Sequence, residues 1–587
     1  MRSIRVTALV LALGACKASD TIAVKLPTTS SIKLNPCSTT GTLSLAAAQT
    51  VRVDCSNGGT TLTLAGNGAS YLVVPQFATD QGANSHVNYI LYEGSGVAAG
   101  AANRLPSTRF SPGFGAGFGV GAILPGMRPL RAQREAERVL RSRMRARSAG
   151  LRALFSQQPG GARRAAVLPP PAAGSIKAFH VASSFTVNQW KTVGAKLAYV
   201  GNNLLLYIDT LAPANGFTAA QLTSYGQLFD QTLYPLDTTA FGSPSDIDNN
   251  GRVIMLMSPV VNADTPVATC ASQGYVAGFF DTADFDGPLD PNSNQAEIFY
   301  SIVPDPTGVF SCSHSVADLG GSVPATFMHE LQHLINYSQH VVVSGGAPGD
   351  SWMDEGLSII AEELGSLYYE AKCPPPSCRA NAAQFFPDSA QGFVEGFLYD
   401  SYQYALLPDT ASLTLNTDDL NGFSWRGGDW LLMRWLGDQF GSTIFRKLER
   451  GPSNGVTNIQ QATGQSFPSL FANFGLALYT DSLPGLARST ALPVNRFATR
   501  NVKALWARLY ATSGPAIDVP IPNPVQLSAI TSDSSSSVMT PGTMTYFRLD
   551  TPATSATVTI RFAPPGGGAF AASLRPQMAV FRLPTGQ

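Results

Sequence analysis

Two histidines and a glutamate in one short stretch have the types and spacing of a metal-dependent hydrolase site. His329 and His333 are four positions apart, with Glu330 between them. On a helix these histidines share one face about 5–6 Å apart, so both can reach one tetrahedral Zn²⁺ at about 2.0–2.1 Å. Glu330 would lie beside the metal, which suits a base for a water rather than a ligand. The alternative is two surface histidines on an amphipathic helix.

A catalytic zinc site needs a third protein ligand, and a third histidine is not at the right spacing. Metzincins have a glycine three positions after the second histidine and a histidine six positions after it. Asn336 and Gln339 occupy those positions here, and His340 comes one residue late. The alternative is a glutamate from a second helix. Glu355 offers one, with 21 residues between it and His333.

Two segments resemble a known peptidase family. The segment W-M-D-E-G-L-S (352–358) resembles the W-L-N-E-G-x-[AS] segment of Glu-zincins, whose glutamate is the third zinc ligand. Together with H-E-L-Q-H-L-I-N (329–336), it resembles the hyicolysin-like metallopeptidases, which are secreted bacterial proteins. The resemblance extends more loosely from about residue 176 to residue 441. It implies a zinc endopeptidase with Glu355 as the third ligand, although Asp354 replaces the usual Asn.

The same resemblance implies roles for residues around the metal. Glu330 would take a proton from a metal-activated water and pass it to the leaving amine. Glu362, seven positions after Glu355, is expected to orient a ligand histidine, whereas Glu363 is expected on a solvated helix face. Related Glu-zincins stabilise the oxyanion with a downstream Tyr or His, and no His follows His340. The candidates are Tyr399, Tyr402 and Tyr404, each of which could equally be a packed aromatic, and Arg426 as a substitute.

Two helices and a preceding sheet must position these residues. The first helix carries both histidines, with Ser322 as its cap and Pro324 in its first turn. The segment 296–302 is the strand nearest this helix in sequence, so we expect it to be the edge that pairs with an extended substrate. The layout is an α+β peptidase domain, with a mixed sheet followed by helices and the zinc between them. Further strands are expected at 198–200, 204–208, 252–257 and 275–280, and helices at 219–233, 428–440 and 466–479.

Composition divides the chain into five regions. They are a lipoprotein signal peptide at 1–15, a β-sandwich-like domain at 23–100, a linker at 101–173, the zinc metallopeptidase domain at 174–512 and a C-terminal β-rich domain at 519–587. The linker is first rich in Gly and Pro and then forms a basic helix at about 128–155. We expect this helix to be a solvated connector. Contact with anionic lipid and proteolytic processing are the alternatives.

The amino terminus predicts export. Arg2 and Arg5 precede an apolar run that ends in L-G-A-C (13–16). This tetrapeptide resembles a bacterial lipobox, which implies a lipid on Cys16 and therefore a membrane partner. An ordinary signal peptide with an incidental cysteine is the alternative. Because Lys17 is not Asp, the resemblance favours the outer membrane over the inner one, so we expect an envelope lipoprotein or a secreted protein.

Six cysteines remain after Cys16, an even number that predicts disulfides in an exported chain. Zinc binding by these cysteines is the alternative, but the sequence contains no C-x-x-C pair. Proximity along the chain favours the pairs Cys37–Cys55, Cys270–Cys312 and Cys373–Cys378.

A turn rich in Asp and Asn, D-I-D-N-N-G (246–251), resembles the front of a calcium loop. Asp246, Asp248 and Asn250 would supply the oxygens. The twelfth position is Met257 instead of Glu, so the segment is not an EF-hand. A Ca²⁺ site is one interpretation, and an Asx-rich turn before a strand is the other.

Composition narrows the function classes. Charged residues make up 13% of the chain and the formal net charge is zero, which argues against a nucleic-acid binder. No apolar run of 18 or more residues occurs outside the amino terminus, so no transmembrane helix is predicted. The sequence favours a zinc endopeptidase acting on protein or peptide substrates. The alternatives are a surface binding or adhesion lipoprotein with a residual or structural zinc site, and a zinc hydrolase with a non-peptide substrate.

Overall fold

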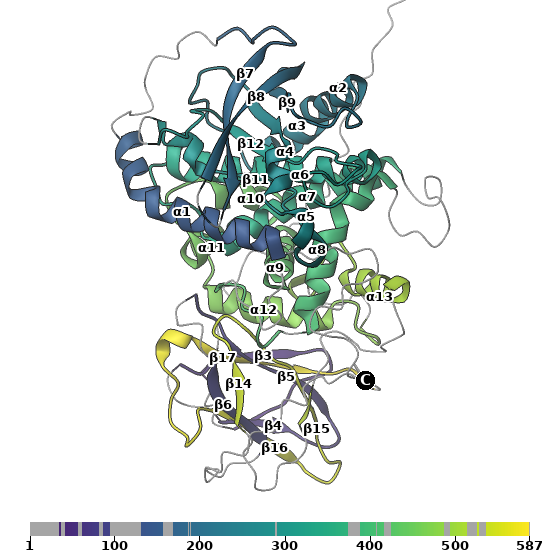
Figure 1. The fold of residues 1–587 in the computed structure, drawn as a ribbon. Coiled ribbons are helices and arrows are strands. Elements are labelled where there is room, and N and C mark those ends of the chain that lie inside the picture. The colour runs from purple at the N-terminus through teal and green to yellow at the C-terminus, as the bar shows by residue number, and fades with distance from the viewer. Residues whose placement is uncertain are drawn as a thin grey trace, which may run out of the picture. The chain divides into compact units, whose positions relative to one another are not determined.

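The computed structural model divides the chain into two units, Met1–Ile32 and Lys33–Gln587 (Figure 1). The signal peptide and Cys16 fall in the first unit, which lies outside the described residues. Within the second unit, the structure describes residues 35–36, 41–56, 61–80, 86–93, 131–156, 168–185, 187, 189–287, 290–373, 388–406, 408–415, 424–486, 493–513, 525–527 and 536–585.

A six-stranded mixed sheet begins the predicted peptidase region. Its order is β11-β12-β10-β9-β8-β7, and β10 pairs in parallel with both β9 and β12. All five residues of β10 are buried, as expected for a central strand covered on both faces. The strands are β7 (Ile176–Ser184), β8 (Gln189–Val200), β9 (Leu204–Asp209), β10 (Val253–Met257), β11 (Gly278–Phe280) and β12 (Ile298–Ser301).

The expected substrate edge is wrong. Strand β12 lies inside the sheet, because β10 pairs with one side of it and β11 pairs antiparallel with the other. The edge strand beside β12 is β11, which lies further from the histidine-bearing helix in sequence, and the opposite edge is β7. Sequence proximity does not predict an edge, because the order of strands in a sheet is set by crossovers and not by chain order.

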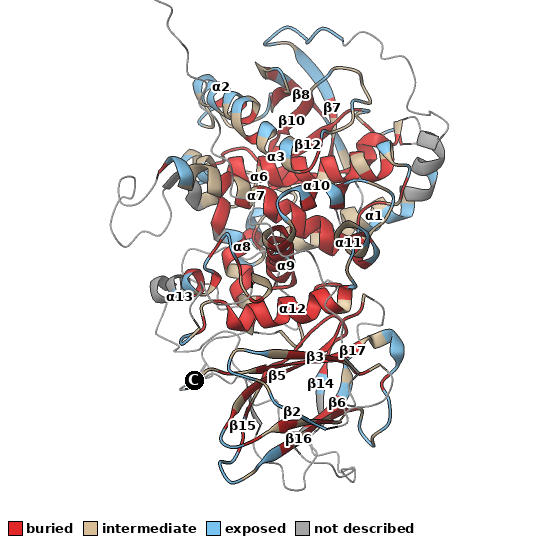
Figure 2. Ribbon diagram, turned by 180° about the vertical axis from the view of Figure 1, so that it is seen from behind, coloured by how far each residue is buried: buried red, intermediate tan, exposed pale blue. Residues whose placement is uncertain are grey.

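Helices follow the sheet and form most of the core, and Figure 2 shows α9 and α12 almost entirely buried and α6 and α7 buried over most of their length. Helices α2 (Ala219–Leu228), α3 (Tyr234–Ala240), α4 (Pro259–Ala263) and α5 (Val267–Gln273) lie between strands. The later helices are α6 (Val316–Tyr337), α7 (Ser351–Lys372), α8 (Asp388–Leu406), α9 (Ser424–Phe440), α10 (Thr443–Glu449), α11 (Gly455–Thr463), α12 (Phe467–Thr480) and α13 (Val502–Ser513), with π-helical turns η1 (Phe229–Leu233) and η4 (Ser338–Val343) and the 3₁₀ turn η2 (Thr282–Phe285).

Helix α6 begins earlier than the sequence predicts. Its N-cap is Ser315, which forms a reciprocal capping box with Asp318, and Pro324 lies inside the helix. The hydroxyl of Ser322 bonds back to the carbonyl of Asp318 at 3.4 Å, as helical Ser residues often do, instead of capping. The capping box satisfies two backbone donors at once, which makes it the stronger start.

The two predicted β-rich domains are one β-sandwich. Strand β17 pairs with both β3 and β5, and β16 pairs with both β4 and β6. Alternation predicts strands but not their partners, which explains why the sequence suggested two modules. The sheet orders are β1-β3-β17-β5-β15-β13 and β14-β6-β16-β4-β2. The strands are β1 (Asn35–Pro36), β2 (Thr42–Leu43), β3 (Thr50–Asp54), β4 (Thr61–Ala65), β5 (Ser70–Phe77), β6 (Val87–Glu93), β13 (Val525–Leu527), β14 (Ser536–Met539), β15 (Phe547–Asp550), β16 (Thr557–Ala563) and β17 (Pro576–Arg582).

The basic segment is helical, as predicted, but it is not a solvated connector. Helix α1 (Arg131–Ser156) packs against η2, η4 and α5 of the peptidase region (Figure 1). Ala136 and Glu137 are buried in this contact. The prediction of a solvated helix was wrong because it rested on the number of arginines. Several of these arginines pair with acidic groups of the predicted peptidase region.

The disulfide Cys270–Cys312 is confirmed, with a Cα–Cα distance of 5.7 Å. Cys55 and Cys373 are also disulfide-bonded. Their expected partners, Cys37 and Cys378, lie outside the described residues. Among the helices that the structure describes, none combines the length and apolar character needed to cross a bilayer.

Candidate active site

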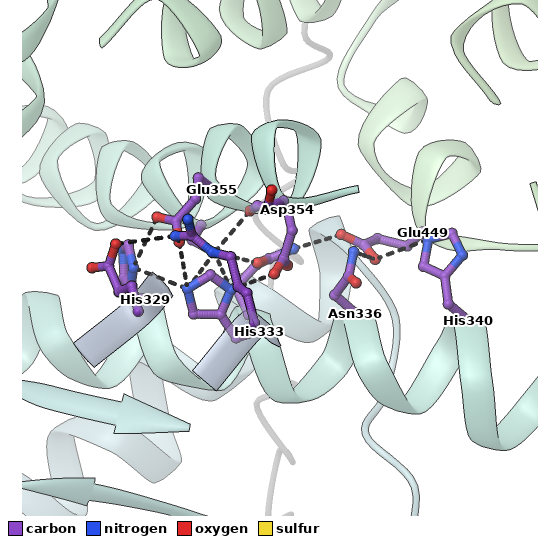
Figure 3. Close-up of polar contacts among 12 residues, drawn as sticks. His329, His333, Asn336, His340, Asp354, Glu355 and Glu449 are labelled. Carbon is purple, nitrogen blue, oxygen red and sulfur yellow. Dashed lines mark hydrogen bonds and ion pairs between the residues drawn. The ribbon is translucent and has the colours of Figure 1, made fainter. Parts of the chain in front are cut away.

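Helices α6 and α7 bring His329, His333 and Glu355 together (Figure 3). The two Nε2 atoms are 3.1 Å apart. Oε2 of Glu355 lies 3.7 Å from Nε2 of His329, and Oε1 lies 3.7 Å from Nε2 of His333. Ligand atoms around a tetrahedral zinc at about 2.0–2.1 Å lie about 3.3–3.4 Å from one another. The three side chains therefore fit one metal ion.

A carboxylate behind each histidine orients it. Nδ1 of His329 is 2.7 Å from Oε1 of Glu362, at the position the sequence predicts. Nδ1 of His333 is 3.0 Å from Oδ2 of Asp354, a partner that the sequence analysis did not assign. Such contacts turn Nε2 of each ring toward the shared site and raise its basicity as a ligand.

The protonation of the ligands follows from burial and charge. Burial, followed by the charges of His333 and Arg426, lowers the pKa of His329 to about 3, so its ring is neutral. Burial opposes the charge on His333, but Asp354 and then Glu355 raise its pKa to about 10. For Glu355, burial is outweighed by Arg426 and Arg141, which hold its pKa well below the usual range. Glu355 is therefore ionised, as a metal ligand must be.

Glu330 lies in the same cavity and is 4% exposed. Burial, with smaller contributions from Glu137 and Glu355, raises its pKa to about 8. It also lies beside the sheet edge: a Cβ on Gly278 of β11 would stand 3.6 Å from Cγ of Glu330. A peptide bound along this edge would therefore reach the carboxyl group of Glu330.

Behind the ligands, two polar residues of α6 hold a buried glutamate of α10. Gln332 and Asn336 donate to the two carboxylate oxygens of Glu449, at 2.5 and 2.9 Å (Figure 3). Ser358 of α7 donates to the side-chain oxygen of Gln332 at 2.5 Å. Burial, with the charge of Asp354, raises the pKa of Glu449 well above its ordinary value. These hydrogen bonds hold α6 against α7 and α10. In the sequence, the only signal for them is the four-residue spacing of Gln332 and Asn336, which places both side chains on one face of α6.

Of the four oxyanion candidates, the structure brings Arg426 to the site. Its Nε lies 3.1 Å from Oε2 of Glu355, and its Nη2 lies 3.5 Å from Nε2 of His329. Tyr337, which the sequence analysis missed, lines the cavity with a buried hydroxyl that has no hydrogen-bond partner. Its position four residues after His333 is the signal that could have found it. Among the described residues that line this cavity, none is Tyr399, Tyr402 or Tyr404.

Helix α1 contributes side chains that the sequence did not assign to the site. Arg141 forms an ion pair and hydrogen bond with Oε1 of Glu355. Glu137 accepts hydrogen bonds from Arg141 at 3.0 Å and from Arg426 at 3.2 Å. Gln133, Glu137 and Arg141 are spaced by four residues, so they share one helical face, and this periodicity was the available signal.

Glu363 is not on a solvated face. It is fully buried, accepts from Arg500 at 2.5 Å and from Arg434 at 3.2 Å, and its pKa is lowered because these two arginines outweigh burial. The prediction of an exposed position was wrong because it rested on the charge of Glu363 alone, and two buried arginines pair with that charge.

At the acidic turn 246–251, the structure adds Glu297 to two of the predicted calcium ligands. Asp246 and Asp248 lie with Glu297 in a group whose ligand atoms are within 4.8 Å of one another. Oε2 of Glu297, a residue 1% exposed, has no hydrogen-bond partner. Asn250 bonds within the turn: its side-chain oxygen accepts from the backbone N–H of Arg252 at 2.5 Å, and its amide donates to Asp248 at 2.6 Å.

Comparison with known proteins agrees with a metallopeptidase relationship. No family model matches the chain. The chain is 30% identical over 178 residues to the neutral metalloprotease ShpI of Staphylococcus hyicus. The matched part is 30% of this chain and 37% of that protein, so the chain spans well under half the length of this relative.

Proposed function

We propose that this protein is a zinc endopeptidase of the hyicolysin-like, Glu-zincin type. The observation that carries the proposal is the group of three side chains whose nearest ligand atoms lie 3.1–3.7 Å apart in each pair, with a carboxylate behind each histidine. The similarity to a neutral metalloprotease supports it. Two histidines and a carboxylate are a donor set typical of catalytic zinc, which keeps a further position open.

In the proposed mechanism, the chain positions the substrate and moves its protons. Zinc in this site would supply a Lewis acid that acidifies water and polarises the substrate carbonyl. The substrate backbone pairs with β11, which brings its carbonyl beside Glu330. Glu330 accepts the proton of the attacking water and delivers it to the leaving amine. Its raised pKa makes the carboxylate a stronger proton acceptor. Arg426 donates to the oxygen that becomes negatively charged.

Two isosteric substitutions test the assignment of ligand and base. Glu355→Gln should lose zinc and activity together, because it weakens one of three protein ligands. Glu330→Gln should keep stoichiometric zinc but lower peptide hydrolysis about 10²–10⁴-fold, because it removes the proton acceptor. Glu362→Gln should weaken zinc binding about 10–100-fold. Zinc content and hydrolysis are measured on each variant, and full hydrolysis by Glu330→Gln would refute the proposal.

A binding or adhesion lipoprotein with a structural zinc is the rival proposal. A structural site is closed by its ligands and has no use for a buried carboxyl group beside the metal. Glu330 is such a group, so its position favours catalysis. The similarity to a metalloprotease supports protein or peptide substrates. If the substrate is instead not a peptide, Glu330→Gln should still bind zinc, but neither the wild type nor any variant should cleave peptides.

We further propose Ca²⁺ at Asp246, Asp248 and Glu297. Three carboxylates whose oxygens lie within 4.8 Å of one another are hard ligands of the kind that calcium prefers. The buried, unpartnered Oε2 of Glu297 supports a cation there, because a lone carboxylate oxygen is unfavourable in the interior. Glu297 adds a carboxylate to the ligands predicted from the sequence, Asp246, Asp248 and Asn250.

We also propose export with a lipid on Cys16, which places the enzyme on the outer membrane or, without the lipid, outside the cell. The support is the lipobox-like L-G-A-C (13–16). Growth with a labelled fatty acid should label the wild type and not Cys16→Ser. If the wild type is not labelled, the lipid anchor is refuted and secretion without an anchor is the proposal that remains.

A further inference from the structure

Helix α1 lies over the candidate active site and supplies five residues that line its cavity, Gln133, Glu137, Leu140, Arg141 and Met144. These positions recur at intervals of three and four residues, so one face of the helix is turned to the site. We propose that α1 is an autoinhibitory segment that occupies the substrate cleft and keeps the peptidase latent until it is displaced. The proposal concerns the regulation of the same site and therefore rests on the proposed function.

The first support is the edge strand. The side-chain amide of Gln133 donates to the carbonyl of Gly278 at 3.2 Å, and its oxygen accepts from the N–H of Ala277 at 3.0 Å. An extended peptide that adds to a sheet edge uses the same kinds of backbone groups. Because Gly278 lies beside Glu330, Gln133 takes up backbone groups that the substrate needs next to the base.

The second support is the ion-pair network at the ligands. Arg141 pairs with Glu355, the carboxylate that would hold the metal. Glu137 bridges Arg141 and Arg426 and so satisfies both guanidinium groups within the site. These α1 side chains therefore occupy the guanidinium and carboxylate groups beside which a bound peptide substrate would have to lie.

The third support is a pair of partly exposed ion pairs that tether α1 outside the cavity. Arg147 lies 2.7 Å from Asp286 and 2.6 Å from Asp290, outside the residues that line the cavity. The side chain of Arg147 is 26% exposed. Partly exposed ion pairs contribute little individually and are screened by salt, so a helix held this way can be displaced.

The test reverses one charge of this tether in the full-length protein. Arg147→Glu places like charges beside Asp286 and Asp290 and touches no cavity-lining residue. Arg138→Glu is the matched control, because Arg138 is on the same helix, 66% exposed, and pairs only locally with Glu135. For both variants and wild type we would measure zinc content, amide hydrogen exchange of α1, and binding of a peptidyl hydroxamate and of acetohydroxamate, which is small enough to bypass the helix.

In the Arg147→Glu protein, amide hydrogen exchange of α1 should be faster and zinc should be retained. The variant should bind the peptidyl hydroxamate at least about tenfold more tightly than wild type, because a larger fraction of the molecules has an open substrate cleft. Acetohydroxamate affinity should change little, and Arg138→Glu should resemble wild type. The proposal is overturned if α1 exchanges faster while peptidyl hydroxamate affinity stays the same, or if Arg147→Glu does not speed exchange.

Hydroxamate binding needs the metal but not turnover, so the two proposals can fail separately. If Arg147→Glu opens the cleft but Glu330→Gln in that background hydrolyses peptide at the same rate, the proposed mechanism fails while the latency is supported. If wild type and Arg147→Glu hydrolyse peptide at the same measurable rate, although the helix exchanges freely in the variant, the latency fails while the peptidase is supported.

Discussion

Arg426 uses all three of its guanidinium nitrogens inside the candidate site. They contact Glu355, Glu137 and His329 at 3.1, 3.2 and 3.5 Å. The residue is 8% exposed, and the nearby carboxylates keep it charged by outweighing the effect of burial on its pKa. A fixed cation in a water-poor site stabilises developing negative charge more strongly than it would in water. If Glu137 leaves with α1, the same guanidinium becomes available to the substrate.

We therefore predict that Arg426→Lys lowers kcat about 10²–10³-fold, because lysine keeps the charge but loses the planar fork. The measurement is kcat, KM and zinc content in the Arg147→Glu background. Tyr404→Phe is the control, since its hydroxyl is buried without a hydrogen-bond partner and does not line the cavity. An unchanged kcat for Arg426→Lys, or a large loss for Tyr404→Phe, would contradict this assignment.

Glu297 gives the calcium proposal a pH dependence. Burial raises its pKa to about 7, although Ser245 and the N–H of Ile247 oppose the rise. In the unfolded chain the group titrates near its ordinary value of 4.5. Between these two values the unfolded state holds fewer protons than the folded state, so without calcium the stability falls as pH rises from about 4.5 to about 7.

Calcium should reverse this loss, because it binds the ionised carboxylate. We predict that the increase in Tm on adding Ca²⁺ is larger at about pH 8 than at about pH 5, and that Glu297→Gln abolishes the difference. Thermal unfolding at both pH values, with Ca²⁺ or with EGTA, measures the change in Tm. Equal shifts at both pH values, or a normal calcium effect in Glu297→Gln, would exclude this ligand.

Among the secondary-structure elements, β11 and α6 set the distance between substrate and base. They meet at Gly278, where an added Cβ would lie 2.6 Å from Cγ2 of Thr326 and 2.7 Å from the carbonyl oxygen of Tyr300. Neither neighbour can yield easily, because one belongs to the zinc-ligand helix and the other is backbone of β12. A side chain here must therefore move the edge strand away from Glu330.

We predict that Gly278→Ala lowers the free energy of unfolding by about 1–3 kcal/mol and also reduces hydrolysis. Gly321→Ala is the comparison, since Gly321 is exposed on α6 and no atom lies within 4 Å of its added Cβ. That variant should gain about 0.5–1 kcal/mol, as expected for Gly to Ala in a helix. Denaturant unfolding and peptide hydrolysis check both variants. A fully stable and active Gly278→Ala protein would contradict the predicted crowding.

At the scale of the whole molecule, the N-terminal strands belong to the same sandwich as the last strands of the chain. Strands β3–β6 interleave with β15–β17 in the sandwich, whereas α1 follows them in sequence and packs on the peptidase region. A cut between α1 and β7 would therefore free one end of α1 without removing any strand. This arrangement allows the helix to be released while the sandwich stays intact.

We predict that protein cleaved at a protease site engineered between α1 and β7 remains one particle. Size-exclusion chromatography should show both pieces eluting together until denaturant is added. Val580→Pro is the control, because Val580 is buried in β17 between Val51 and Val73, where proline removes a central ladder bond. The cleaved control should separate. Separation of the cleaved wild type would mean that strand pairing does not hold the pieces together.

The sequence alone determined the features that depend on local periodicity. The i and i+4 spacing put His329 and His333 on one face of a helix, and the seven-residue interval put Glu362 on the same face as Glu355. Short apolar runs located β9 and β10, and proximity paired Cys270 with Cys312. The metal and catalytic roles of these residues stay predictions, but their positions follow from helix geometry that no distant contact can alter.

Tertiary structure decided everything that depends on which distant segments meet. Alternation did not show that β16 and β17 complete a sandwich with N-terminal strands, or that β11 rather than β12 is the sheet edge. Charge did not show that Glu363 is buried between Arg434 and Arg500, or that Arg141 pairs with Glu355. The physical reason is that a local pattern specifies an element and its faces, whereas each partner is selected by long-range packing and charge pairing.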